Sequence, residues 1–531
     1  MAIRLVFSAM DSDAGAPPAD AAGGPAAGGE ELRRQRVRKV EALRAAGIEP
    51  FALRFDRTHA AAEAIDRFLE AEKAATGDAG GAAGGSDTRV GPLSLAGRIT
   101  RHRAQGKVGF ADITDGGVRI QLYVQAEVLG DAMAIFDGLD LGDIVGVEGD
   151  VFRTRRGEVS LDVSRITLLT KALRPLPDKW HGLKDPELRF RQRHLDLVVN
   201  PQVRGVLTLR SRLISALREA LEARGFIEVE TPVLHAIAGG AAARPFTTHH
   251  NALDIDLNLR IALELHLKRL VVGGMDRVYE VGRVFRNEGI DRRHNPEFTL
   301  LELYQAYTDL DGMIELTEVL LRTAAEKVLG TMVVRRGEIE VDLAEPWDRV
   351  EMLDAVRAAN PDVDIDDLEQ LRRRVGDTGA VRYEAMDWGE LVFELFERTV
   401  EASLERPTFV TGFPLSVSPL ARRRVDDERL VERFELYIAG QELVNAFAEL
   451  TDPLDQRARF EQQLAMRQAG DEEAHPMDEE FIAALEQGMP PTGGLGIGID
   501  RLVMLLAGVD NIREVIAFPL LRPADGGDEA D

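Results

Sequence analysis

Between residues 93 and 170 the chain repeatedly alternates apolar and polar residues over short segments. The alternation is clearest in the segments LSLAGRIT, VGFADIT, RIQLYVQ, DIVGVEGDVFRT and EVSLDVSRITLLT. A period of two residues is typical of strands that bury one face, and the Gly and Asp residues between the segments favour turns. The pattern therefore predicts a small β-barrel over residues 92–175.

Beyond residue 200 the apolar spacing becomes that of a helix. Leucines recur every four residues at positions 209, 213, 217 and 221, and Gly225 suits the end of a helix over 206–224. We expect a strand over 226–234 to follow, although it contains Pro232. The remainder mixes strands with helices, and a charged section over 345–405 predicts a helical insertion. Residues 201–523 are therefore expected to form one large α+β domain.

Low-complexity segments separate these parts of the chain. Residues 1–29 and 75–91 are too rich in Ala and Gly to bury a core, which predicts a disordered tail and a linker. Residues 30–74 are expected to be helical, 176–200 to be a connector and 524–531 to be an acidic tail. Basic residues crowd the segment before Gly47, at positions 33, 34, 36, 38, 39 and 44. They form either a solvated helix face or a contact to an RNA backbone.

Length and composition narrow the classes of function. A chain of 531 residues is too long for one compact core, so a multidomain protein is expected. The absence of cysteine excludes disulfides, thiolate metal sites and cysteine nucleophiles. No apolar run is long enough to span a membrane, and no signal peptide is evident, so we expect a cytoplasmic protein. A formal charge of −26 argues against nonspecific coating of nucleic acid but leaves local RNA contacts open.

Residues 277–307 predict two antiparallel strands joined by an unusually long, charged loop. The loop carries Arg286, Glu288, Arg293 and His294. A guanidinium group matches the oxygens of a phosphate, so arginines at a strand edge suit a phosphate site. The alternative interpretation is a solvated hairpin tip.

Two further segments carry candidate chemistry. Residues 489–508 predict a glycine-rich strand followed by a helix with Arg501 in its first turn. The glycines would let a ligand lie against the strand backbone, or they would simply allow close packing of strand and helix.

Residues 433–450 predict a strand pair that turns at Ala439 and Gly440. Glu435 and Glu442 would converge across that pair, and paired carboxylates beside a phosphate site suit Mg²⁺. Two unrelated surface acids remain the alternative.

Together these segments resemble motifs 2 and 3 of class II aminoacyl-tRNA synthetases, and residues 206–234 resemble motif 1, through which such enzymes form homodimers. The blocks GGAAARPFTTHHNALDIDLNLRIALELHLKRL and FRNEGIDRRHNPEFTLLELYQAY are similar to lysyl-tRNA synthetases in particular. The resemblance covers about residues 30–523 and implies an N-terminal OB-fold that binds the anticodon, followed by a catalytic domain with an antiparallel sheet flanked by helices. It also implies ATP-dependent ligation of L-lysine to tRNA-Lys through a lysyl-adenylate, with release of AMP and pyrophosphate.

The resemblance assigns roles to individual residues. Arg286 and Arg501 would be the catalytic cations on ATP and the lysine carboxylate. The remaining ATP-binding residues would be Glu288, Asn295 and Phe298 at the adenosine and Arg293 and His294 at the outer phosphates, with Glu435 and Glu442 as Mg²⁺ ligands. The lysine site would combine Glu302, Tyr304 and Glu449 at the ε-ammonium, Glu264 and the Gly240 backbone at the α-ammonium, Asn445 at the carboxylate and Phe447 along the methylenes. Arg103, Phe110 and Gln121 would contact the anticodon.

Some positions depart from the pattern common in that family. Leu263 and His266 replace a proline and an aromatic residue, and Val444, Ala446 and Ala448 stand where glycine, glycine and serine are common. The added methyl groups are expected to narrow the amino-acid pocket. Two other hypotheses are an enzyme that activates a lysine-like acid for another acceptor and a catalytically silent RNA-binding module. The silent module has no need for Arg286, Arg501, Glu435 and Glu442 together.

Overall fold

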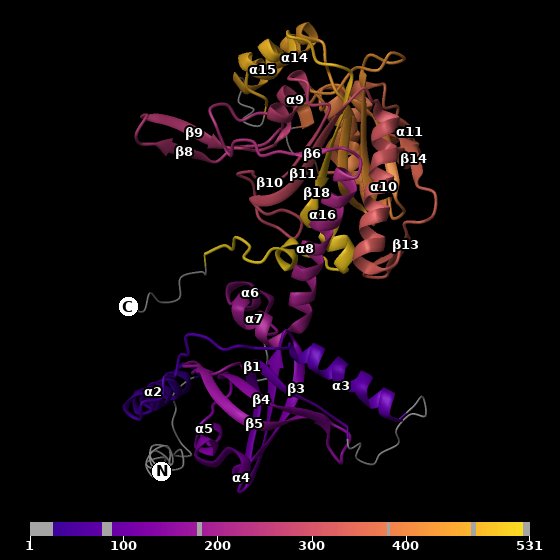
Figure 1. The fold of residues 1–531 in the computed structure, drawn as a ribbon. Coiled ribbons are helices and arrows are strands. Elements are labelled where there is room, and N and C mark those ends of the chain that lie inside the picture. Colours follow the sequence, from indigo (N-terminus) through magenta and orange to yellow (C-terminus); the bar gives the residue numbers. More distant parts are fainter. Residues whose placement is uncertain (1–24, 77–87, 178–182, 380–382, 469–473, 524–531) are drawn as a thin grey trace. The chain divides into compact units, whose positions relative to one another are not determined.

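The computed structural model describes residues 25–76, 88–177, 183–379, 383–468 and 474–523. The chain divides into two compact units, residues 1–185 and 186–531, which are described separately below (Figure 1). Most of the expected tail over 1–29 and linker over 75–91, and all of the acidic tail over 524–531, lie outside the described residues. Among those described, no helix is long and apolar enough to cross a membrane.

The first unit is the expected barrel. Its strands are β1 (Arg89–Gln105), β2 (Val108–Asp115), β3 (Val118–Gln125), β4 (Ile144–Arg153) and β5 (Val159–Thr170), and they close in the order β1-β2-β3-β5-β4. Short helical turns α4 (Ala126–Leu129), η1 (Gly130–Ala132) and α5 (Met133–Asp137) lie between β3 and β4. Alternate residues such as Leu122, Val124 and Val147 are fully buried inside, as the period of two predicts. The OB-fold prediction is confirmed.

Two helices precede the barrel strands: α2 (Pro25–Ala45) and α3 (Ala61–Thr76). Helix α2 begins before residue 30, where it was expected, because Pro25 suits a first turn and two alanines follow it. The Arg36 side chain is buried and donates to the carbonyl oxygens of Ala172 and Arg174 at 2.9 and 3.0 Å, and Lys39 Nζ lies 2.8 Å from Asp140 Oδ1. These two basic residues therefore hold the helix to the barrel.

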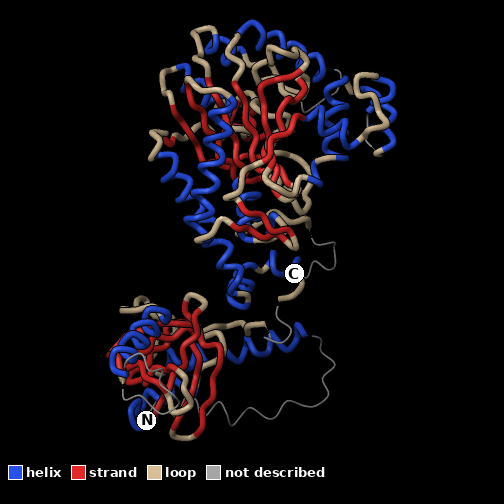
Figure 2. Tube along the Cα trace, turned by 90° about the vertical axis from the view of Figure 1, so that its right-hand side faces the viewer, coloured by secondary structure: helices blue, strands red, loops and turns tan. Residues whose placement is uncertain are grey.

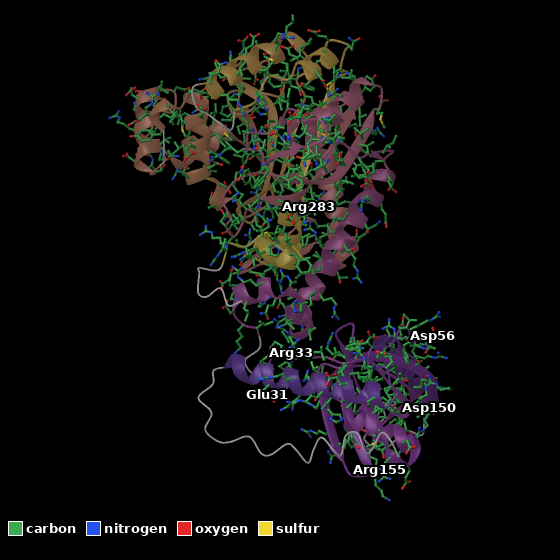
Figure 3. The ribbon with its side chains drawn as sticks, turned by 90° about the vertical axis from the view of Figure 1, so that its left-hand side faces the viewer. Glu31, Arg33, Asp56, Asp150, Arg155 and Arg283 are labelled. Carbon is green, nitrogen blue, oxygen red and sulfur yellow. The ribbon has the colours of Figure 1, made fainter. Side chains whose placement is uncertain are left out.

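The other basic residues of α2 lie toward solvent. Arg33 pairs with Glu30 at 3.0 Å and Arg34 with Glu31 at 3.2 Å, each within the helix. Figure 3 labels Glu31 and Arg33 on this helix. Local pairing of this kind is typical of a solvated helix face. The structure therefore favours a packing role for the inner basic residues and a solvated face for these two arginines.

The second unit is built on one large sheet. Its strand order is β14 (Asp348–Glu351), β15 (Thr408–Pro414), β16 (Leu430–Ile438), β17 (Gln441–Ala448), β18 (Thr492–Gly498), β11 (Glu297–Ala306), β10 (Arg277–Phe285) and β6 (Ile227–Glu228). The central pairs are antiparallel as expected, but β14 and β6 join the two edges in parallel. The sheet is therefore mixed. Both edge strands come from parts of the chain that lie far from their partners in sequence.

Helices cover both faces of this sheet (Figures 1 and 2). Helices α8 (Pro201–Glu222), α10 (Leu310–Leu329) and α16 (Ile499–Ala507) pack on the face that carries Leu301 and Leu303. Helices α9 (Glu264–Val272), α14 (Pro453–Gln468) and α15 (Glu479–Leu485) pack on the face that carries Tyr304 and Ala306. Odd and even residues of β11 therefore point to different helical layers.

Two expected elements differ from the structure. The strand over 226–234 is replaced by β6 and by β7 (Leu234–His235), because Pro232 between them has no N–H to donate to a ladder. The section over 345–405 contains β14 and the helices α11 (Met352–Ala359), α12 (Leu368–Asp377) and α13 (Trp388–Thr399), with 3₁₀ turns η2 (Tyr383–Ala385) and η3 (Glu401–Ser403). These helices share an apolar cluster with one side of β15 and β16.

The remaining elements are peripheral. Helices α6 (Pro186–Arg191) and α7 (Arg193–Val199) open the unit, and α17 (Ile512–Val515) closes it. Strands β7, β9 (Ile255–Leu259) and β8 (Thr247–His250) form a small sheet, and β12 (Val333–Arg336) pairs with β13 (Ile339–Asp342). None of these small strands joins the large sheet in the described part of the chain.

Candidate active site

A cavity of about 770 Å³ lies on the β11–β18–β17–β16 part of the large sheet. It brings together the predicted residues of the second unit, with Glu449 as the exception. Its lining includes Gly240, Glu264, Arg286, Glu288, Arg293, His294, Asn295, Phe298, Glu302, Tyr304, Glu435, Glu442, Asn445, Phe447 and Arg501.

Strand register explains how distant residues meet in this cavity. Glu302 on β11 lies opposite Gly496 on β18, which lies opposite Asn445 on β17, which lies opposite Glu435 on β16. The next row on the same face runs from Tyr304 through Gly494 and Phe447 to Arg433. The glycines of β18 therefore form a floor without side chains between an acidic end and the two glutamates of β16 and β17.

The acidic end is centred on Glu302. Its two carboxylate oxygens accept hydrogen bonds from the Leu263 N–H at 3.1 Å and from the Tyr304 hydroxyl at 3.2 Å. Burial, and next the neighbouring Glu264 carboxylate, raise the pKa of Glu302 to about 7. An opposite charge in contact with this carboxyl group would favour its ionised form, so a cationic ligand would compensate for its burial.

Glu449 follows β17 and lies over Gly494, on the face of the sheet that carries Tyr304, but it does not line the cavity. Its side chain is fully buried, and a Cβ added at Gly494 would overlap Glu449 Oε1, so only glycine fits at that position. Glu449 Oε1 has no hydrogen-bond partner among the described residues, while Oε2 pairs with Lys268. Burial raises the pKa of Glu449 to about 8 against the opposing effect of Lys268. An unpartnered buried acceptor of this kind favours a ligand that brings a donor.

The basic end is formed by Arg286 and Arg501. The Arg286 guanidinium lies 5.2 Å from the ring centre of Phe298, and its Nε donates to the Ile261 carbonyl at 3.4 Å. Arg501 Nη1 donates to Glu442 Oε2 at 2.8 Å, and its Nη2 lies 3.2 Å from His294 Nε2. Although burial opposes it, Glu442 raises the pKa of Arg501, whereas burial lowers the pKa of Arg286. Both groups stay charged, because a guanidinium is not deprotonated in proteins.

Glu435 and Glu442 are brought together by the predicted turn. Ala439 and Gly440 have φ values of 53° and 67°, as a tight hairpin turn between β16 and β17 requires. Burial raises the pKa of Glu435 to about 7 against the effect of Arg433, and the Glu442 carboxylate adds to the rise. The mutual repulsion of two carboxylates is what a divalent cation relieves.

The donor set around these two glutamates fits Mg²⁺. Both side chains offer hard oxygen ligands. No group of three or more His, Cys, Asp or Glu placed for a metal occurs in the described ranges. Mg²⁺ commonly takes one or two carboxylates and completes its coordination with substrate phosphates and water.

Several residues of the site were not predicted from the sequence. Arg433 donates to Asn445 Oδ1 at 3.1 Å and also pairs with Glu435, so it orders both side chains. Asp500 accepts from the Thr299 N–H at 2.6 Å, which holds the start of α16, and hence Arg501, against β11. Lys268 lies buried beside Glu264 and Glu449. In the sequence, Lys268 looks like an ordinary surface partner for a glutamate four residues earlier.

The departures from the family pattern do not narrow the cavity, contrary to expectation. Val444 and Ala446 are buried in the cluster beneath the opposite face of the sheet. Ala448 alternates in phase with them, and Leu263 and His266 also lie outside the cavity lining. The reason is strand alternation: Asn445 and Phe447 face the cavity, so their neighbours along β17 face away.

The predicted anticodon residues lie on the outside of the barrel. Arg103 on β1 lies opposite Phe110 on β2, which lies opposite Tyr123 on β3, and Gln121 shares the face of Tyr123. The Phe110 and Tyr123 rings are 5.5 Å apart, and Phe152 lies 5.9 Å beyond Tyr123. Gln121 Oε1 accepts a hydrogen bond from Ser160 at 3.0 Å. Tyr123 and Phe152, which were not predicted from the sequence, extend the aromatic surface that begins at Phe110.

Known proteins resemble this chain over most of its length. Residues 185–522 match the family described as tRNA synthetases class II (D, K and N), and residues 93–169 match the OB-fold nucleic acid binding domain. A protein of Moorella thermoacetica named "Lysine--tRNA ligase" is 52% identical over 499 residues, which cover 93% of this chain and 98% of the relative.

Two further relatives carry the same name. The Carboxydothermus hydrogenoformans protein is 51% identical over 93% of this chain and 99% of its own length. The Bacillus subtilis protein is 50% identical over 93% of this chain and 98% of its own length. The chain therefore belongs to the class II tRNA synthetases, in the family of the lysine–tRNA ligases.

Proposed function

We propose that this enzyme ligates L-lysine to tRNA-Lys, first forming lysyl-adenylate from ATP and then releasing AMP with the charged tRNA. The observation that carries the proposal is one cavity over the glycine floor of β18 that holds both an acidic end around Glu302 and a basic end around Arg286 and Arg501. A long amino acid with a cationic tip and a carboxylate fits between two such ends. The names of the relatives agree with this assignment.

The acidic end is proposed to bind both ammonium groups of lysine. Glu302, Tyr304 and Glu449 would receive the ε-ammonium, because Glu449 Oε1 lacks a hydrogen-bond partner among the described residues and burial raises the pKa of Glu302 to about 7, which a cation in contact would oppose. Glu264 and the Gly240 backbone would receive the α-ammonium. Two buried carboxylates at fixed depth reject neutral and acidic side chains, since these would leave acceptors unpaired.

The carboxylate end of lysine and the nucleotide are proposed to meet at Arg286. Asn445 would orient the carboxylate and Phe447 would pack along the methylenes. Asn295 is buried, and its Oδ1 has no hydrogen-bond partner among described residues, which suits the amino group of adenine. Glu288 and Phe298 would complete the adenosine site, with Arg293, His294 and Arg501 at the phosphates.

Glu435 and Glu442 are proposed to hold Mg²⁺, which when bound would neutralise charge on the phosphates of ATP. The protein's own residues supply the rest of the catalysis by position and charge. Arg286 lies where it would contact both the attacking carboxylate and the α-phosphate, so it would stabilise the charge that develops as they approach. The assigned residues include no covalent nucleophile, because the carboxylate of the substrate attacks ATP itself.

The partners of the enzyme follow from the same proposal. Ile227, Val233 and Leu234 in the segment resembling motif 1 are 53%, 40% and 46% exposed, which favours burial of residues 206–234 in a homodimer. The outer face of the barrel that carries Arg103, Phe110 and Gln121 would contact the tRNA-Lys anticodon. We propose that the enzyme acts in the cytoplasm, where tRNA charging supplies protein synthesis.

Lysine-dependent ATP–pyrophosphate exchange and charging of purified tRNA-Lys test the proposal. Folded protein that shows neither reaction with lysine would contradict it. Arg286→Ala is expected to abolish exchange, because no other cation lies at both the carboxylate and the α-phosphate. Arg292→Ala is the matched control, since this neighbouring loop arginine does not line the cavity and should leave exchange unchanged.

A further inference from the structure

Lys268 is a fully buried lysine immediately behind the proposed amino-acid site. It lies on α9 one turn after Glu264, and its Nζ is 2.5 Å from Glu264 Oε1. The same ammonium pairs with Glu449 Oε2, and it lies 6.0 Å from the ring centres of both Tyr304 and Phe481. One internal cation therefore contacts both carboxylates that are proposed to receive the two ammonium groups of the substrate.

A buried ammonium group is energetically unfavourable if it only fills space. Taking the charge out of water costs several kcal/mol, by order of magnitude, and an apolar side chain of similar volume is often equally stable or more so. The pairing repays this cost only if Glu264 and Glu449 are both charged. The arrangement therefore points to a requirement for charge at this place rather than for packing alone.

The charges at the acidic end support this view. Glu264 and Glu302 both act electrostatically on Glu449, and Lys268 opposes them. When all three carboxyl groups are ionised, as a bound cation favours, three carboxylates and one ammonium leave two negative charges unneutralised. Those two charges match the two ammonium groups of a diamino acid. Without Lys268, a third negative charge would be buried in the same space, and the site would take up a proton to remove it.

We propose that Lys268 is a positioning and specificity-determining residue, a fixed internal ammonium that holds Glu264 and Glu449 side by side in their charged form so that the site accepts two further ammonium groups. This inference rests on the proposed lysine-binding function. The proton that would replace Lys268 goes to Glu449, because burial already raises the pKa of that carboxyl group to about 8, above the value of about 7 for Glu302.

The groups that face Lys268 come from five parts of the chain. They are Glu264 on its own helix, Glu449 after β17, Tyr304 with Glu302 on β11, Phe481 on α15, and His475 before that helix. Burial, and next Lys268 itself, lower the pKa of His475 to about 4, so this histidine is neutral at physiological pH. The titration that Lys268 is proposed to control is therefore that of Glu449, whose pKa it lowers.

The test uses Lys268→Met in the full chain, which keeps most of the volume and removes the charge. At pH 7.5 the KM for lysine in ATP–pyrophosphate exchange should rise by about tenfold or more, since each unit of pKa displacement lowers the ionised fraction of Glu449 about tenfold. The KM for ATP should stay within about twofold. The KM for lysine should recover at higher pH than in the wild type, which a loss of packing alone would not cause. Arg269→Met, the adjacent residue paired with Glu480 at 3.3 Å, is the matched control and should behave as wild type.

A double variant, Lys268→Met with Glu449→Gln, keeps the test decisive if the single variant fails to fold, because it leaves one carboxylate, Glu264, without its cation instead of two. Its KM for lysine should be high and should no longer recover with rising pH, and its preference for lysine over neutral norleucine should fall. A single variant with the wild-type KM and pH profile, or a double variant that still recovers at high pH, would overturn the inference. Inactive wild-type protein in the same assay would instead contradict the proposed function.

Discussion

At the scale of single residues, the properties of the acidic end depend on which groups donate hydrogen bonds to the Glu302 carboxylate. The Leu263 N–H donates to one oxygen at 3.1 Å and lowers the pKa that burial raises. The sequence comparison marked Leu263 only as a departure from a common proline. Proline has no N–H, so this departure adds a hydrogen-bond donor to the site.

Leu263→Pro is therefore expected to weaken lysine binding in a pH-dependent way. Loss of the N–H should raise the pKa of Glu302 above about 7, so that the KM for lysine at pH 7 rises by roughly threefold to tenfold, the effect of one neutral hydrogen bond. The increase should fade above pH 8.5. Leu263→Ala, which keeps the N–H, is the control, and a proline variant with an unchanged pH profile would contradict the prediction.

The raised pKa values of Glu302 and Glu449, about 7 and 8, also predict how stability depends on pH. An unfolded glutamate has a pKa of about 4.3, so the folded protein retains protons that the unfolded chain releases. The contribution of these two groups to stability is therefore full below about pH 4 and is lost as pH rises through 7 to 8.

Lysine should reverse this loss by replacing the protons. Differential scanning fluorimetry from pH 6 to 8.5 should show the increase in Tm caused by saturating lysine growing with pH. Norleucine, which lacks the ε-ammonium, is the matched control ligand and should not show the trend. A lysine-induced increase that is constant or shrinks with pH would contradict the assignment of these carboxyl groups to the ammonium site.

Much of the residue set could be predicted because its chemistry lies in contiguous segments. Glu435 and Glu442 flank one turn, and Glu302 and Tyr304 alternate on one strand. Lys268 could not be predicted, since its burial depends on Glu449, which lies 181 positions later in the sequence. A lysine in a helix is ordinarily solvated, and only the tertiary packing of α9 against β11 and α15 removes it from water.

At the scale of elements, β18 determines the shape of the site. Its glycines meet side chains on both neighbouring strands in register, so each glycine has its own tolerance for a side chain. A Cβ at Gly494 would overlap Glu449 and Tyr304, whereas a Cβ at Gly496 would approach Glu302 Cγ only to 3.8 Å. The sequence predicted an open strand but not which glycine is obligatory.

Gly494→Ala should therefore destabilise the fold, while Gly496→Ala should not. Overpacking of this kind typically costs about 1–3 kcal/mol, which corresponds to a decrease in Tm of several degrees in the absence of ligand. Gly496→Ala is expected to keep the wild-type Tm within about one degree, because ordinary van der Waals contact is available to its methyl group. Equal decreases in both variants would show that the register of β18 differs from the one described.

The alternation of apolar and polar residues predicted the strands better than it predicted which strands pair with them and what packs against them. It correctly placed Asn445 and Phe447 on one face of β17, and the same rule puts Val444 and Ala446 in the core on the other. The sequence analysis nevertheless assigned the added methyl groups to the pocket. The parallel edge strands β6 and β14 were also missed, because short edge strands carry little periodicity and their partners lie far along the chain.

At the scale of the whole molecule, two units with separate apolar cores are proposed to carry out different parts of the reaction. The barrel encloses its own cluster, and the large sheet packs between two helical layers. Adenylate formation is proposed to use residues of the second unit alone, whereas recognition of tRNA-Lys is proposed to use Arg103, Phe110 and Gln121 of the first. The two activities should therefore be separable by substitutions in one unit.

Phe110→Ala tests this separation in the full chain. Stacking of a base on an aromatic ring is worth about 1–3 kcal/mol, so charging of tRNA-Lys should lose about tenfold to a hundredfold in kcat/KM for tRNA. Lysine-dependent ATP–pyrophosphate exchange without tRNA should be unchanged, because no residue of the barrel lines the cavity. Phe51→Ala is the control and should charge normally, because this exposed aromatic residue of the same unit contacts Arg44 and takes no part in the ring contacts of Phe110 and Tyr123. Loss of exchange in the Phe110 variant, or full charging by it, would contradict the proposed role of the outer face of the barrel.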